Sequence, residues 1–147
     1  MKRNNHITPI RCIAIVVLLL LATIHVSAQN RIDKFMDNIS TKGHCELTSV
    51  VKRDPQTRKV LKVVKVLTLN GLACNDLVDV VRSESSSGTF SEKSADGQTV
   101  LTLTLADTRT TRIYVLDATP KYSVRNSNKS ADAGYSKAVL TAIVKYK

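Results

Sequence analysis

Residues 98–105, QTVLTLTL, carry the clearest strand pattern of the chain, because their side chains alternate with a period of two. Leu101, Leu103 and Leu105 fall on one face of an extended chain, while valine and threonine fall on the other. Such alternation predicts a β-strand with one buried face. Residues 89–95 are predicted to form the preceding strand, because Asp96-Gly97 between the two segments is a strong hairpin signal.

Two further strands are predicted on the C-terminal side of this hairpin. Residues 112–117 (RIYVLD) form the first, and residues 137–147 form the last, with Leu140, Ala142, Val144 and Tyr146 on one face. Residues 119–136 lie between them and are rich in asparagine and serine, with a proline and a glycine. We expect this polar segment to be a long mobile loop.

A second hairpin is predicted on the N-terminal side, from residues 44–53 (HCELTSVVKR) and 58–69 (RKVLKVVKVLTL), with a turn at residues 54–57. A four-residue loop makes paired residue numbers sum to 111, so that Val51 lies opposite Val60 and Leu47 opposite Val64 on a core face. The other side then carries charged pairs: Glu46 with Lys65, and Lys52 with Lys59.

Two amphipathic helices are predicted, one before each group of strands. In residues 30–42 the apolar side chains recur at i, i+3, i+4 and i+7, with Asn30 as the N-cap and Gly43 at the end. In residues 70–83 the expected N-cap is Asn70, and the apolar stripe consists of Ala73, Leu77, Val80 and Val81. Asp33 and Asp37, four residues apart, are expected on the outer, solvated face of the first helix.

The predicted order is therefore α-β-β-α-β-β-β-β. Short turns join most neighbouring strands, which favours antiparallel pairing. We expect an α+β fold, in which an antiparallel sheet of about six strands has both helices on one face. The core should be aliphatic, because the chain has two phenylalanines, four tyrosines and no tryptophan.

The first 28 residues have the three parts of a cleavable export signal. Basic residues precede an uncharged apolar run at residues 12–24, and Val26-Ser27-Ala28 then provides the small residues that a signal peptidase needs. The apolar run is shorter than the ~20 residues of a spanning helix. We therefore expect cleavage after Ala28, a single α+β domain at residues 29–147, and no membrane span after cleavage. Cleavage lowers the net charge of the 147-residue chain from +10 to +7, because it removes three basic residues and no acid.

Three segments that follow the export signal resemble a known group of proteins. They are residues 31–35 (RIDKF), 48–55 (TSVVKRDP) and 59–66 (KVLKVVKV). The chain resembles small exported proteins of unknown function from Gram-negative gut bacteria. The resemblance implies a periplasmic or secreted bacterial protein, and it transfers no activity.

The mature sequence offers few residues for catalysis or metal binding. It keeps one histidine, His44, and two cysteines, Cys45 and Cys74. His44 and Cys45 are neighbours on a predicted strand, so their side chains diverge. We therefore predict no catalytic set, no metal site and no cofactor. In an exported protein Cys45 and Cys74 could form a disulfide, or they could be two free, buried thiols, and the sequence leaves both open.

The most distinctive feature is a basic hairpin at residues 52–65. Its cationic side chains are the anion-binding candidates Lys52, Arg53, Arg58, Lys59, Lys62 and Lys65. Such a cluster could bind lipopolysaccharide or another acidic surface, or it could be a solvated face that guards a sheet edge. The absence of interleaved aromatic residues argues against nucleic acid.

Three functions follow from these patterns. The leading hypothesis is a non-catalytic, extracytoplasmic binding module that presents a sheet face or edge to a protein partner in the cell envelope or to a second copy of itself. The second is a polyanion binder that uses the basic hairpin. The third, a small hydrolase, would need a deep pocket around His44, Cys45 or two close carboxylates.

Overall fold

The computed structural model describes residues 30–43, 45–95, 97–121 and 134–147. The elements follow the predicted order, with a short 3₁₀ helix added between α3 and β3. They are α2 (Arg31–Thr41), β1 (Glu46–Arg53), β2 (Val60–Asn70), α3 (Ala73–Ser83), η2 (Ser85–Ser87), β3 (Thr89–Ala95), β4 (Gln98–Ala106), β5 (Thr110–Pro120) and β6 (Tyr135–Tyr146). The expected export signal and its cleavage site lie outside the described residues.

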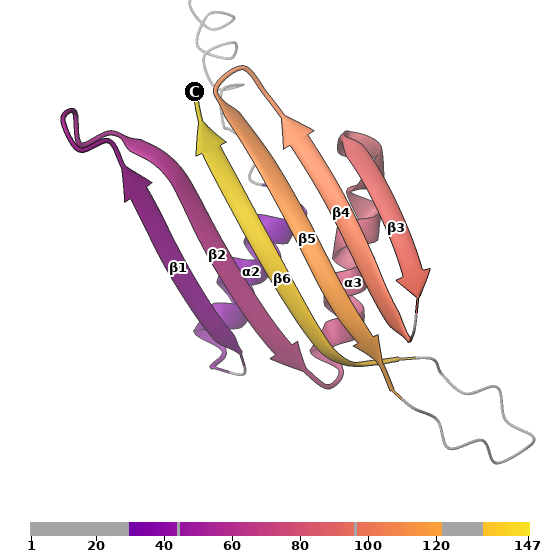
Figure 1. Cartoon of the computed structure of the whole chain (residues 1–147). Helices are drawn as coiled ribbons and strands as arrows, with labels where there is room; N and C mark the ends of the chain where they lie inside the picture. The colour runs from indigo at the N-terminus through magenta and orange to yellow at the C-terminus, as the bar shows by residue number, and fades with distance from the viewer. Residues whose placement is uncertain (1–29, 44, 96, 122–133) are drawn as a thin grey trace, which may run out of the picture.

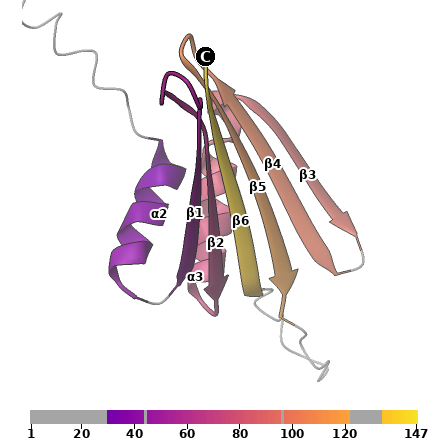
Figure 2. The same cartoon turned by 60° about the vertical axis from the view of Figure 1, so that its left-hand side comes forward.

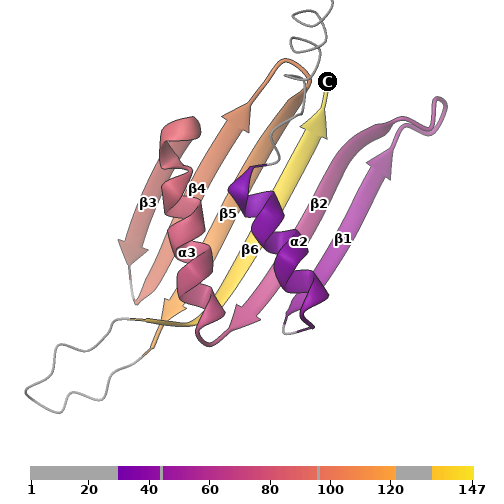
Figure 3. The same ribbon diagram turned by 180° about the vertical axis from the view of Figure 1, so that it is seen from behind.

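The strands form one six-stranded antiparallel sheet in the order β1-β2-β6-β5-β4-β3 (Figure 1). The C-terminal strand β6 lies in the middle, between β2 and β5. The connection through α3 carries the chain from β2 to β3 at the far edge of the sheet. Both helices lie on the same side of the sheet (Figures 2 and 3). The predicted α+β class and helix placement are therefore confirmed.

The core lies between the helices and the sheet face that they cover. Leu67, Leu140, Leu116 and Leu101 follow one another in register across β2, β6, β5 and β4, and all four are fully buried. The helices contribute the buried side chains Ile32, Met36, Cys74, Leu77, Val78 and Val81. The core is aliphatic, as predicted, except for the buried ring of Tyr114 on β5.

The two helices begin differently. Asn30 caps α2 as predicted, because its side-chain oxygen accepts a hydrogen bond of 2.8 Å from the Asp33 amide. The prediction for Asn70 was wrong, since Asn70 is the last residue of β2 and pairs with Lys137. Gly71 makes the turn at φ +78°, and α3 starts at Ala73 with no side-chain cap.

The predicted register of the basic hairpin was wrong. Leu47 lies opposite Leu67 and Val51 opposite Val63, and both pairs face the helices. The loop extends further along the chain than the predicted residues 54–57, because the Asp54 amide donates a hydrogen bond to the carbonyl of Lys59. The Asp54 carboxylate stabilises this loop by accepting hydrogen bonds from the Gln56 and Thr57 amides. A bulge near the loop, between Lys52 and Arg53, shifts the register once more.

The last two strands are longer than predicted. β5 continues to Pro120 and β6 begins at Tyr135, so both ends of the expected loop at residues 119–136 belong to the sheet. The remainder of that loop, residues 122–133, lies outside the described residues. Among the helices of the described ranges, none combines the length and the apolar character needed to cross a membrane.

Candidate interaction surfaces

The sheet has one face without helices, which we call the open face (Figures 1 and 2). Successive strand residues alternate between the two faces, so its members follow from the register. One row across the sheet consists of Val50, Val64, Ile143, Ile113 and Thr104. The next row consists of Thr48, Val66, Thr141, Val115 and Thr102. The middle of the open face is therefore β-branched throughout, and none of these ten positions carries a charge or an aromatic ring.

Three lysines cross the open face beside these rows. Lys52 lies opposite Lys62, and Lys62 lies opposite Lys145 on β6. We call this set the lysine row. No ion pair reaches any of the three within the part of the chain that the structure describes. Like charges placed directly opposite destabilise a sheet, so a negative charge beside this row would relieve the repulsion among the three lysines.

The six predicted anion-binding residues do not share one surface. Lys65 lies on the helix-covered face, where its Nζ is 3.7 Å from Oδ1 of Asp37. Lys52 and Lys62 join Lys145, which is distant in sequence and was not among the predicted residues. The other three, Arg53, Arg58 and Lys59, are exposed at the tip of the hairpin, where the Arg53 guanidinium donates to the Arg58 carbonyl.

Cys45 and Cys74, the two candidates for a disulfide, are free thiols in the structure. Cys74 lies in the core, where burial raises the pKa of its thiol and keeps it protonated. Cys45 is partly buried, and its thiol donates a weak hydrogen bond of 3.6 Å to the Ile39 carbonyl. His44 lies outside the described residues. Among the described residues, no group of three or more His, Cys, Asp and Glu side chains is arranged to hold a metal ion.

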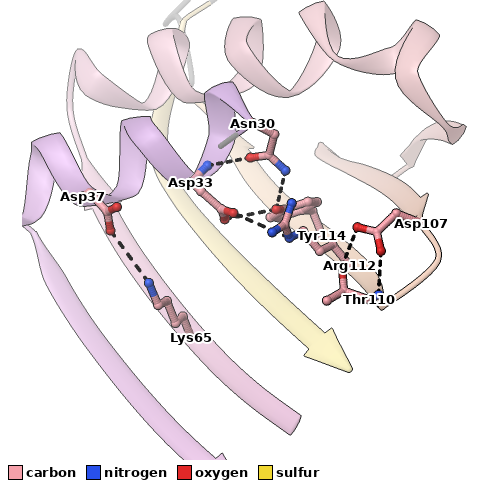
Figure 4. Close-up of polar contacts among 8 residues, drawn as sticks. All are labelled: Asn30, Asp33, Asp37, Lys65, Asp107, Thr110, Arg112 and Tyr114. Atoms are coloured by element: carbon pink, nitrogen blue, oxygen red, sulfur yellow. Dashed lines mark hydrogen bonds and ion pairs between the residues drawn. The ribbon is translucent and has the colours of Figure 1, made fainter. Parts of the chain in front are cut away.

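A polar network that the sequence patterns did not predict lies under the N-terminus of α2 (Figure 4). The side-chain nitrogen Nδ2 of Asn30 donates to the Tyr114 hydroxyl at 2.5 Å, and that hydroxyl donates to Oδ1 of Asp33 at 3.0 Å. The other carboxylate oxygen of Asp33 is 3.8 Å from Nε of Arg112. We call these four residues the Tyr114 network. The prediction that Asp33 lies on a solvated face was wrong, because its carboxylate points toward the sheet.

The network holds its tyrosine in the neutral form. Burial raises the pKa of Tyr114 far above its usual range, and the nearby charge of Asp33 acts in the same direction. A tyrosine with so high a pKa is a poor general base at neutral pH. Its bonds to Asn30 and Asp33 join the start of α2 to β5.

A surface hollow of about 330 Å³ lies beside the network. Arg31 and Arg112 line it together with Glu84 and Asp107, so its charges largely balance. Asp107 is also engaged within its own turn, where its carboxylate accepts hydrogen bonds from the Thr110 hydroxyl and from the amides of Arg109 and Thr110. These bonds lower the pKa of Asp107 to about 2. Both carboxylates of the hollow are therefore engaged by groups of the protein itself, since Glu84 lies 3.8 Å from Nε of Arg31 and Asp107 is bonded within its own turn.

Comparison with known proteins identifies a family to which the chain is similar. Residues 29–118 match a family described as a domain of unknown function, DUF5024, and this range is more than half of the chain. It runs from the start of α2 into β5 and ends before β6. No curated protein and no solved structure matches the chain.

Proposed function

We propose that this chain, which belongs to the DUF5024 family of unknown function, is a non-catalytic module that binds a protein partner through its open face. It would act in the periplasm or outside the cell, once the predicted signal peptide at residues 1–28 is removed. The observation that supports this function is the composition of the open face.

When one face of a sheet meets only water, the side chains on that face are usually polar. The open face instead carries Val64, Ile143 and Ile113 side by side on three central strands. Contiguous apolar side chains rimmed by polar ones are typical of protein-binding surfaces. The ten central positions lack the aromatic rings that stack on nucleic acid bases.

The chemistry of the partner follows from the arrangement of charge. The lysine row lies directly beside the apolar middle of the face, with Lys62 two residues from Val64 on β2. The complementary surface is an apolar patch with carboxylates along one side. Such pairing selects partners and orients them as they approach.

Replacing Ile143 with lysine should weaken this complex by about tenfold or more, because a charge would be placed in the middle of the apolar contact. The fold should persist, since the side chain of residue 143 points away from the core and is only partly buried. Asn38→Lys is the matched control, because it adds the same charge on the exposed side of α2.

The measurement is chemical cross-linking in the cells that produce the protein, followed by mass spectrometry. The native protein and Asn38→Lys should give the same partner, cross-linked through Lys62 and Lys145. Ile143→Lys should lose these cross-links while it keeps a native melting temperature. Recovery of the native protein only as a monomer, or retention of the same cross-links by Ile143→Lys, would contradict the proposal.

The lysine row also favours a second candidate function, the binding of a polyanion such as lipopolysaccharide. Lys62 and Lys65 provide a matched pair, since they lie three residues apart on β2 and point to opposite faces. Lys62→Gln should reduce the salt dependence of binding to immobilised heparin by a slope of about 1, whereas Lys65→Gln should leave it unchanged. This function is ruled out if the native protein passes through heparin and lipopolysaccharide columns at low salt, or if the two variants behave alike.

A further inference from the structure

The edge strand β1 is exposed on both of its faces. All eight of its residues are exposed. Toward the helix side Leu47 and Val51 remain 36% and 46% exposed, and toward the open side Val50 remains 61% exposed. These three residues are half of the large hydrophobic side chains that are exposed in the described part of the chain. The free backbone edge of β1 is therefore bordered by exposed apolar side chains on both faces of the sheet.

The two edges of the sheet differ in how they resist strand addition. At the centre of β3, Glu92 and Lys93 are charged, and Glu92 is bound to Arg82 at 2.6 Å. Any antiparallel pairing of β3 with another β3, centred on either residue, would place like charges opposite each other. Charges of this kind protect an edge against another chain. The centre of β1, residues 47–51 (LTSVV), has no charge and no proline.

The β1 sequence is complementary to itself in one antiparallel register. When Ser49 lies opposite Ser49 of a second copy, paired residue numbers sum to 98 and the helices of both copies lie on the same side. Glu46 then lies opposite Lys52, Leu47 opposite Val51, and Thr48 opposite Val50, each pair occurring twice. Opposite charges and β-branched or aliphatic pairs directly across two strands stabilise a sheet.

The neighbouring registers lack this match. A pairing centred on Thr48 places Val50 opposite Glu46, and one centred on Val50 places Arg53 opposite Leu47. Each of them leaves charged groups facing apolar ones. In the register centred on Ser49, the partner's Glu46 also extends the lysine row and offsets the repulsion between Lys52 and Lys62.

We propose that β1 pairs in antiparallel fashion with β1 of a second copy, with Ser49 on the two-fold axis, so that two six-stranded sheets become one. The pairing uses an edge of the sheet, and it does not depend on the protein partner proposed for the open face. The joined sheet would present two open faces side by side.

Exchanging the charges of Glu46 and Lys52 tests the register of this pairing. Sedimentation of the mature protein at micromolar concentrations should show a dimer. Glu46→Lys and Lys52→Glu should each weaken it by about tenfold or more, because each variant places like charges opposite each other twice. The double variant Glu46→Lys/Lys52→Glu should restore dimerisation to nearly the native strength, since the pairs are again of opposite sign.

A cysteine at the two-fold axis gives an independent measurement. Cα atoms directly opposite in an antiparallel pair are ~4.5–5.5 Å apart, which is within the range of a disulfide. In a Cys45→Ser background, Ser49→Cys should form a disulfide-linked dimer on mild oxidation. Ser91→Cys, at an exposed position on the other edge strand, should remain monomeric. A native protein that sediments only as a monomer, a double variant as weak as the single ones, or equal cross-linking at residues 49 and 91 would overturn the proposal.

Discussion

Replacing Leu140 with alanine is expected to lower the free energy of unfolding by about 3 kcal/mol. Leu140 lies on the central strand β6, is fully buried, and has Leu67 and Leu116 directly opposite it on the two neighbouring strands. A cavity at this position borders side chains from three strands. These strands are fixed by their hydrogen bonds on both sides, so the site cannot collapse readily around the missing atoms.

Urea denaturation provides the measurement, with Val139→Ala as the control. Val139 precedes Leu140 on the same strand, but it points to the open face and is only partly buried. Its truncation should cost about 1 kcal/mol or less. The transition midpoint should fall for Leu140→Ala with little change in slope. Equal losses for the two variants would show that the open face is packed as tightly as the core.

The strands of the C-terminal half could be predicted because their apolar side chains alternate cleanly. In β4 Leu101, Leu103 and Leu105 mark the inner face without ambiguity, and the predicted strand agrees with the observed one to within a residue. A helix with four apolar residues on one face is equally informative, and α2 was found within one residue at each end. Periodicity fixes such elements because burial on one face is a local property of the sequence.

The register of the basic hairpin could not be predicted in the same way. β2 has valine on both faces, at Val63 and Val64, so either face could have been assigned to the core. The choice between them depends on the side chain of Asp54, which shapes the loop, and on the nearby bulge. The observed register differs from the predicted one by three residues. Because three is an odd number, the two faces of β2 are exchanged, so that Lys62 lies on the open face and Lys65 on the helix side.

Residues that meet only through the tertiary fold were missed for a different reason. Lys145 joins Lys62 because β6 inserts between β2 and β5, and no local pattern indicates that strand order. The Tyr114 network joins residues that are about 80 positions apart. One local signal existed, because Arg112 and Tyr114 are two residues apart and therefore share the inner face of β5. A charged residue predicted on that face requires a partner from the helix layer.

Removing that partner should destabilise the fold, and Asp33→Ala is expected to lower the free energy of unfolding by about 2–3 kcal/mol. The change leaves the Arg112 guanidinium without its carboxylate and the Tyr114 hydroxyl without its acceptor. The side chain of Arg112 is 23% exposed and that of Asp33 is 18% exposed, so water replaces the lost contacts only in part. The Nε of Arg112 is already buried without a hydrogen-bond partner among the described residues.

A second ion pair of α2 provides the control. Asp37 and Lys65 are 3.7 Å apart, nearly the same separation as Asp33 and Arg112, but their side chains are 53% and 37% exposed. Because exposed pairs contribute little, Asp37→Ala should cost less than about 1 kcal/mol. Thermal and urea denaturation of the two variants would therefore separate the effect of burial from that of distance.

The double variant Asp33→Ala/Arg112→Met shows whether the loss arises from an isolated buried charge. Removing both charged groups and filling the space with an apolar side chain should recover more than half of the stability lost in Asp33→Ala. Recovery would mean that the main effect of Asp33 is to neutralise the charge of Arg112. The pair would then fix α2 on the sheet without adding much net stability. A double variant that is less stable than Asp33→Ala would instead assign the contribution to packing of the long arginine side chain.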